Sequence, residues 1–206
     1  AECATESLVR PASRPGAPPE GWAHPRIGLG HWPFAGADLQ QHREALARGG
    51  VGQAGVLAKP VRAWIDAWDM RGADQINDMT LAPLHVSASG AGFNYALRLD
   101  TNHALVLQGN AGYSRKSQRG QASYYYSQPY FGVSGHLTLG DSAIEVTGQA
   151  WMDRDWSSQP LATDQSGWDR FSLHLTPGEK LMLFALRQAD GGSHRPATGL
   201  LAKGEC

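Results

Sequence analysis

The sequence has few of the residues that build disulfide frameworks or metal sites. Its 206 residues include two cysteines, Cys3 and Cys206, at opposite ends of the chain. A disulfide would need their α-carbons within about 7 Å of each other, and neither a C-x-x-C motif nor a paired histidine spacing occurs. We therefore expect no disulfide between the tails, no metal site and no cofactor.

The chain also lacks long apolar runs and blocks of like charge. No stretch approaches the roughly 18 apolar residues that cross a bilayer, and AECATESLVR has neither the charged leader nor the apolar segment of a signal peptide. Eighteen Lys plus Arg balance nineteen Asp plus Glu, for a net charge of −1. This balance argues against a nucleic-acid partner, and the composition predicts a soluble chain without a transmembrane segment.

Familiar catalytic motifs are missing as well. GGVGQAG, residues 49–55, contains G-x-G-x-x-G, but a nucleotide site needs a strand before this motif and a helix after it. A predicted helix precedes it here and Lys59-Pro60 follows it, so we interpret the motif as a loop. The sequence contains no G-x-S-x-G elbow, P-loop or H-E-x-x-H motif.

Proline content and turn residues divide the chain. Residues 1–37 form a proline-rich segment that we expect to be irregular and mostly outside the core, and DLQQHREALAR, residues 38–48, predicts a short helix. The rest predicts an all-β protein, either a sandwich or an up-and-down barrel of antiparallel strands in meander order. The expected strands are 61–70, 84–89, 93–99, 104–109, 122–128, 134–140, 143–151, 168–175 and 180–187.

Aromatic and charged residues alternate in the segment GQAWMDRDWSSQPL, residues 148–161. Because successive strand residues point to opposite faces, Trp151, Asp153 and Asp155 share one face with Gln149, while Arg154 and Trp156 share the other with Ala150 and Met152. In residues 168–175 one face carries Trp168, Arg170, Ser172 and His174. Two of the three tyrosines in Tyr124-Tyr125-Tyr126 must likewise point the same way.

Two interpretations of this cluster remain open. The aromatic residues are good strand formers, and the charges fit solvated residues or ion pairs such as Asp155 with Arg170. Alternatively, a carboxylic acid walled by indoles is destabilised in its charged form, so its pKa rises and it can donate a proton near neutral pH. The second interpretation predicts Asp153 as the catalytic acid, with Asp155 as its alternate, and acid-initiated alkene hydration or isomerisation as the chemistry.

Several segments in order resemble the AttH/CrtC-like family, which includes carotenoid 1,2-hydratases and many predicted secreted hydrolases. They are VRAWIDAWDM, LVLQGNAGYSRK, ASYYYSQPYF, GQAWMDRDWSSQPL and GWDRFSLHLTPGEKLMLFALRQADG, and the resemblance covers about residues 42–191. It implies lipocalin-like β-barrel domains: a partial first domain over 38–165, then the start of a second domain and an irregular tail over 166–206. It also implies a periplasmic or secreted location and a possible association with an export system or a membrane surface.

The resemblance further implies an amphipathic site for a hydrophobic, polyene-like or terpenoid-like small molecule. Its ligand-binding residues would be Trp151, Trp156, Trp168, Tyr124, Tyr126, Arg170 and His174. Where the family usually has His-Glu, this chain has Arg154-Asp155, and Arg170 stands where a tryptophan is usual; an arginine cannot serve as an acid at neutral pH. Three hypotheses follow: a hydratase-like enzyme, a non-catalytic carrier or export accessory, and an inactive fragment of an incomplete chain.

Overall fold

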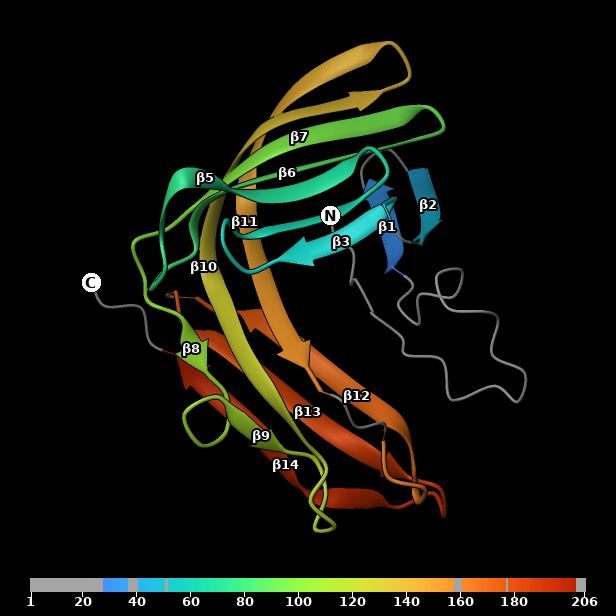
Figure 1. Cartoon of the computed structure of the whole chain (residues 1–206), viewed down its shortest axis with the longest axis vertical. Helices are drawn as coiled ribbons and strands as arrows, with labels where there is room; N and C mark the ends of the chain where they lie inside the picture. The colour runs from blue at the N-terminus through green and yellow to red at the C-terminus, as the bar shows by residue number, and fades with distance from the viewer. Residues whose placement is uncertain (1–27, 37–40, 51, 158–160, 177, 203–206) are drawn as a thin grey trace. The chain divides into compact units, whose positions relative to one another are not determined.

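The computed structural model describes residues 28–36, 41–50, 52–157, 161–176 and 178–202 (Figure 1). Within these ranges the chain forms strands and turns and contains no helix, and both cysteines lie outside them. The strands are β1 (Gly28–Gly36), β2 (Gln41–Gly49), β3 (Ala54–Leu57), β4 (Arg62–Ile65), β5 (Trp68–Asn77), β6 (Ala82–Gly90), β7 (Phe93–Asp100), β8 (Val106–Leu107), β9 (Tyr113–Arg115), β10 (Ala122–Leu139), β11 (Ser142–Trp156), β12 (Gln165–His174), β13 (Lys180–Gln188) and β14 (Ser193–Ala202).

These strands form three sheets. The largest has nine strands in the order β11-β10-β7-β6-β5-β4-β3, with β8 and β9 also paired to β10. The strands β1 and β2 form a separate pair, and β12, β13 and β14 form a three-stranded sheet. The registered pairs are antiparallel, which confirms the predicted all-β antiparallel fold.

The chain divides into two compact units. The first comprises Ala1–Asn77, Ala82–Asp100 and Val133–Gly148, and the second comprises Asp78–Leu81, Thr101–Gly132 and Gln149–Cys206. The long strands β10 and β11 therefore contribute residues to both units. The domain boundaries predicted near residues 37 and 165 stay predictions.

The core of the first unit contains apolar side chains from alternate positions of strands β6 and β7. Along β6 the side chains of Leu84, Val86 and Ala88 are buried, and their partners on β7 present Leu99 and Tyr95 to the same face. The intervening residues of both strands are mostly polar and more exposed. One sheet face is thus apolar and the other faces solvent, as expected for half-buried antiparallel strands.

The second unit buries apolar residues between two sheets. Tyr125 of β10 packs with Met182, Phe184 and Leu186, which occupy alternate positions of β13, and Trp151 of β11 packs against this cluster together with Leu161. In Figure 1 the sheet β12–β14 lies behind the parts of β10 and β11 that belong to this unit. The face of β11 that carries Trp151 and Asp153 therefore meets the face of β12 that carries Arg170 and His174.

The helix predicted over residues 38–48 is wrong. Residues 41–49 form strand β2, which pairs with β1 along its full length from Gly28↔Gly49 to Gly36↔Gln41. The small side chains of Ala45 and Ala47 and the buried Gly49 lie on one face, where they permit close approach to neighbouring strands. Long-range pairing thus overrides the helix propensity of this segment.

The structure also differs from the sequence prediction in strand lengths and number. Residues 61–70 hold a hairpin, with Ile65 opposite Trp68 and a left-handed Asp66 at the turn. Residues 122–139 form one strand instead of two, because Gly135, at φ 151°, continues the strand where a Cβ would lie 2.2 Å from the Ala96 carbonyl oxygen. The strands β1, β3, β9 and β14 were not predicted, and β1 lies in the segment expected to be irregular, where it buries Phe34.

The G-x-G-x-x-G segment is a connection between strands. A turn follows Gly50, with the Gln53 backbone N–H donating to the Gly50 carbonyl oxygen over 3.2 Å, and strand β3 begins at Ala54. No helix begins after the motif in the part of the chain that the structure describes. The loop interpretation is therefore confirmed.

Candidate functional site

The structure brings four of the predicted site residues together inside the second unit. Asp153 of β11 forms an ion pair with Arg170 of β12, and the Trp151 ring meets the His174 ring edge-on at a centroid distance of 5.8 Å. All four residues lie on the faces that strand alternation predicted. Alternation along β11 and β12 turns these side chains toward the space between the two sheets, with the Asp153–Arg170 pair next to the Trp151–His174 pair.

Asp153 is the centre of a dense polar cluster. Besides Arg170, its Oδ1 accepts hydrogen bonds from the Tyr125 hydroxyl at 3.0 Å and the Ser127 hydroxyl at 2.5 Å. The Ser127 hydroxyl in turn accepts from Gln108 Nε2 at 2.8 Å, and both of these polar residues are buried. The Asp153 side chain is 11% exposed and the Arg170 side chain 33%.

The neighbours of Asp153 favour its carboxylate form. A guanidinium and two hydroxyl donors each stabilise a negative oxygen, and a proton on Asp153 would weaken the ion pair. Burial is the largest cause that raises the pKa of Tyr125, so this phenol keeps its proton and donates it. The cluster therefore stabilises the Asp153 carboxylate beside the Arg170 cation. An acid walled mainly by indoles was the expectation, and the proton-donor role of Asp153 stays a prediction.

Asp155 has a different partner from the one expected. Its Oδ2 lies 3.3 Å from Lys116 Nζ, and its side chain is 43% exposed. The suggested ion pair between Asp155 and Arg170 is wrong, because Arg170 reaches the more deeply buried Asp153. The Lys116 ammonium also lies over the rings of Tyr125 and Phe184, at 4.8 and 4.9 Å from their centroids.

The remaining predicted aromatic residues mostly lie on the opposite face of β10 and β11. The Tyr124 ring stacks on Trp156 at 5.9 Å, and Tyr126 meets Trp156 edge-on at 5.7 Å. Tyr113 of β9 joins them, opposite Tyr124 in the strand register and 6.0 Å from its ring. We call Tyr113, Tyr124, Tyr126 and Trp156 the outer aromatic cluster.

The outer aromatic cluster is accessible. Trp156 is 50% exposed and Tyr124 57%, and the Arg154 guanidinium lies 6.0 Å from the Trp156 ring centroid. Sequence reasoning missed Tyr113, because its pairing with Tyr124 depends on the register of a three-residue strand. Trp168 is also 57% exposed, but it lies on β12 and belongs to neither group.

A second polar group joins the exposed His174 and Gln149 to the buried Lys180. The His174 Nδ1 lies 2.6 Å from Lys180 Nζ, which also donates to Gln149 Oε1 at 3.1 Å. Lys180 is 5% exposed and its ammonium lies 5.5 Å from the Tyr130 ring centroid. Sequence reasoning missed Lys180, although KLMLFALR places it on the same strand face as the buried Met182.

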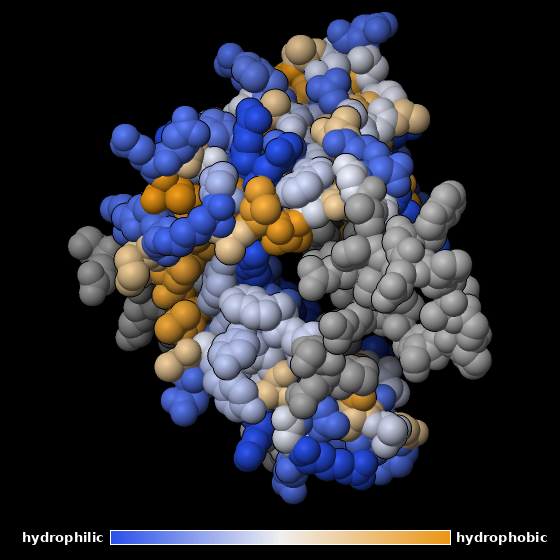
Figure 2. All heavy atoms as spheres, in the orientation of Figure 1, coloured by the Kyte–Doolittle hydropathy of each residue, from blue (hydrophilic) through white to orange (hydrophobic). Residues whose placement is uncertain are grey.

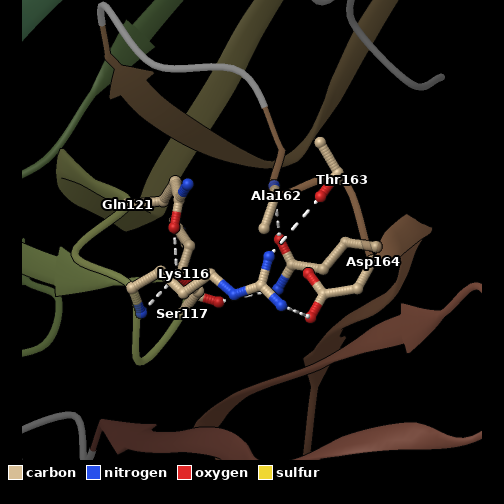
Figure 3. A network of polar contacts seen from close by, with 8 residues as sticks. Lys116, Ser117, Gln121, Ala162, Thr163 and Asp164 are labelled. Carbon is tan, nitrogen blue, oxygen red and sulfur yellow. Dashed lines mark hydrogen bonds and ion pairs between the residues drawn. The ribbon is translucent and has the colours of Figure 1, made fainter.

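A polar network fixes the loop before β10 to the start of β12 (Figure 3). Arg119 contacts Asp164 at 3.1 Å, and the Gln165 side-chain amide donates to the Lys116 carbonyl oxygen at 2.9 Å. Ser117, also in this network, hydrogen-bonds Gln121. Ser117, Arg119, Asp164 and Gln165 line a polar cleft of about 260 Å³. Another cleft, of about 410 Å³ in the first unit, is lined by residues such as Arg71 and Arg98. Neither cleft includes a predicted site residue.

On the side shown in Figure 2, hydrophobic residues occur in separate groups among hydrophilic ones. Among the residues that the structure describes, no helix is long and apolar enough to span a bilayer. The same residues include no group of three or more His, Cys, Asp or Glu side chains that could hold a metal ion.

Comparison with known proteins places the chain in a family. The family model described as AttH-like matches residues 7–205. The chain belongs to the AttH-like family. A comparison with curated proteins finds no match for this AttH-like chain.

Two crystal structures share the fold of this AttH-like protein. One, provisionally assigned as AttH from Nitrosomonas europaea, has a TM-score of 0.76 and 27% identity over 88% of this chain and 56% of that one. The other, kievitone hydratase from Nectria haematococca, has a TM-score of 0.65 and 14% identity over 85% of this chain and 55% of that one. The sequence thus spans little more than half the length of either structure, and the second similarity shows the fold alone.

Proposed function

We propose that this AttH-like protein binds a hydrophobic small molecule of polyene or terpenoid type on the outer aromatic cluster. The observation that carries the proposal is the accessibility of these rings: four aromatic side chains of one unit lie side by side on a sheet face, and Tyr124 and Trp156 are at least half exposed. Such rings offer flat apolar area at low entropic cost, and their hydroxyl and indole groups orient polar ends of a ligand.

Arg154 adds a positive charge beside the outer aromatic cluster. Its guanidinium lies over the edge of the aromatic group, 6.0 Å from the Trp156 ring centroid. A ligand with one hydroxyl or carboxyl end would place that end toward Arg154 and its apolar body across the rings. The residue that replaces the family's usual histidine thus takes part in binding instead of proton transfer.

Fluorescence titration tests the binding proposal. A polyene ligand should quench tryptophan emission saturably, and Trp156→Phe should remove most of the ligand-dependent quenching while weakening binding several-fold. Trp168→Phe is the matched control, because Trp168 is similarly exposed but lies outside the cluster. Equal loss of quenching in both variants, or none in the unmodified chain, would contradict the assignment.

A second candidate function is hydration of a hydrophobic molecule held beside Asp153, on the sheet face opposite to the outer aromatic cluster. It is favoured by the Asp153 cluster beside Trp151 and by the fold shared with kievitone hydratase. In this reaction a proton adds to one alkene carbon, water adds to the other, and the water's surplus proton is released. The Asp153 carboxylate, close to the Arg170 cation and the Tyr125 phenol, fits the task of accepting that last proton; as the acid it would first need to be protonated.

Product analysis separates the hydratase from the carrier. A hydratase should yield product heavier than the alkene by one water, and Asp153→Asn should abolish this product while ligand quenching at Trp156 persists. Asp155→Asn is the comparison, since Asp155 pairs with Lys116 at the margin of the cluster. Saturable quenching without any hydrated product would leave the non-catalytic carrier or export accessory as the function.

The location and wider partners of the protein follow from the family resemblance alone. We propose a periplasmic or secreted protein that associates with an export system or a membrane surface. Fractionation of the native host with compartment markers, and co-flotation of the purified chain with lipid vesicles, would check the two parts separately. Recovery in the cytoplasmic fraction without vesicle binding would contradict both.

A further inference from the structure

Lys180 stands out among the lysines because it is buried without an acidic partner. It is 5% exposed, at the first position of β13, and in the described residues no carboxylate lies within 4 Å of its Nζ. Its polar neighbours are a neutral amide, Gln149, and an imidazole, His174. By contrast, Lys116, which also contacts aromatic rings, has Asp155 as a counterion.

The surroundings of this amine favour its uncharged form. Burial lowers the pKa of Lys180, since an ammonium without a counterion is poorly solvated there. The pKa of His174 is also lowered, first by burial and then by the charge of Lys180. An uncharged imidazole can accept a hydrogen bond from the amine, and an uncharged amine is a nucleophile.

Two polar groups near the amine have no protein partner. The Tyr130 hydroxyl and the Trp151 Nε1 are both buried and make no hydrogen bond within the described structure. Tyr130 presents its ring to Lys180, and Trp151 contacts His174, the residue that touches the Lys180 amine. Buried donors that lack acceptors are costly, so an acceptor oxygen supplied by a ligand would stabilise this group.

The amine is close to the surface although it is buried. His174, whose Nδ1 lies 2.6 Å from Nζ, is itself exposed, so one side chain separates Lys180 from solvent on this side. The rings of Tyr130 and Trp151 make the neighbourhood apolar. The amine therefore lies close to solvent in an apolar environment.

We propose that Lys180 is a reactive amine that takes apolar aldehydes, with His174, Tyr130 and Trp151 as the surrounding site. The Nζ lone pair attacks the aldehyde carbon and a proton moves from nitrogen to the former carbonyl oxygen, giving a carbinolamine. Loss of this hydroxyl with a further proton releases water and leaves a C=N bond between ligand and lysine. The Tyr130 hydroxyl and Trp151 indole supply donors for the oxygen before it departs.

Reductive trapping on the intact chain tests this proposal. Hexanal and cyanoborohydride at pH 7, followed by peptide mass mapping, should modify Lys180 several-fold faster than the exposed Lys59, because the lowered pKa of Lys180 raises the fraction of its amine that is uncharged at this pH. The advantage should shrink as the pH is raised toward 10, because a higher pH also increases the uncharged fraction of an ordinary lysine amine, and glycolaldehyde should show less of it than hexanal.

Two results would overturn the proposal. One is modification of Lys180 no faster than Lys59 in the folded chain, and the other is modification that begins only when urea unfolds it. The Lys180→Arg variant supports the site assignment by losing the adduct while keeping its circular dichroism; the measurement on the unmodified chain stands by itself should that variant misfold. Trapping does not depend on the outer aromatic cluster, so it should persist in Trp156→Phe.

Discussion

Replacing Arg170 with glutamine would leave the Asp153 carboxylate in the second unit with two hydroxyl donors and no counterion. Losing one partner of a fully buried ion pair costs about 3–5 kcal/mol, and the 33% exposure of the Arg170 side chain admits water and reduces this to about 2 kcal/mol. Asp153→Asn should cost about 1 kcal/mol, because an amide oxygen can still accept from Tyr125 and Ser127.

The double variant, with Arg170→Gln and Asp153→Asn combined, tests whether the two residues stabilise the fold through their mutual ion pair. With both charges removed, neither is left without a partner, so the expected loss is about 1.5 kcal/mol, well below the 3 kcal/mol given by adding the single losses. Urea unfolding followed by circular dichroism and by tryptophan emission would measure this, with coincident transitions supporting a two-state treatment. Arg187→Gln is the control, because Arg187 and Asp169 are both more than half exposed and should contribute under about 0.5 kcal/mol.

Additive single losses, within about 0.5 kcal/mol, would refute the reasoning. They would mean that Arg170 and Asp153 are each stabilised by water or by other neighbours. The carboxylate form of Asp153 would then no longer be explained by the ion pair, and the argument that water's proton passes to Asp153 would lose its basis.

Three further predictions concern stability. Gly109→Ala should cost at least 2 kcal/mol in urea unfolding, since a Cβ there, at φ 65°, would lie 2.4 Å from a backbone oxygen; Gly92→Ala, at φ 73° with no atom within 4 Å, should cost about 1 kcal/mol. The pKa of His174 is lowered from 6.5, so the unfolded chain binds the proton more readily and stability should fall as the pH drops below 6.5; His174→Gln should flatten that part of a pH series of thermal melts. Lys180→Met should preserve or raise the melting temperature at pH 7 because it removes a buried amine whose charged form has no carboxylate partner, whereas Lys116→Met should lower it.

The all-β antiparallel fold was predictable because alternation and turn chemistry act locally. Residues 84–89, 93–99 and 180–187 each carry the period-two pattern of a strand with one buried face, and the structure has strands there. Residues 41–49 were not predictable in this way. Their composition favours a helix, and what makes them a strand is pairing with Gly28–Gly36, a contact that no local pattern records.

The sequence predicts which residues of the candidate site share a strand face, but it does not predict which side chains they contact. Period-two parity placed Trp151 and Asp153 on the face that meets Arg170 and His174, since this depends on the strand alone. The choice between Asp153 and Asp155 as the partner of Arg170 depends on how two sheets align, which sequence spacing does not specify. Lys180 was missed for another reason: a lysine in a strand is normally solvated, and its burial follows from the packing of β13.

The two faces of strand β11 explain why residues 151–156 mix aromatic and charged side chains. Because adjacent strand residues serve opposite faces, Trp151 and Asp153 belong to the interior of the second unit while Arg154 and Trp156 belong to the outer aromatic cluster. The pair Arg154-Asp155, which stands where the family usually has His-Glu, therefore alters two environments at once. The arginine adds a cation to the proposed binding face, whereas Asp155 retains an acid that pairs with Lys116. Substituting Arg154 should accordingly change ligand affinity without changing the stability of the Asp153 cluster, so binding and acid–base chemistry can be varied separately in this chain.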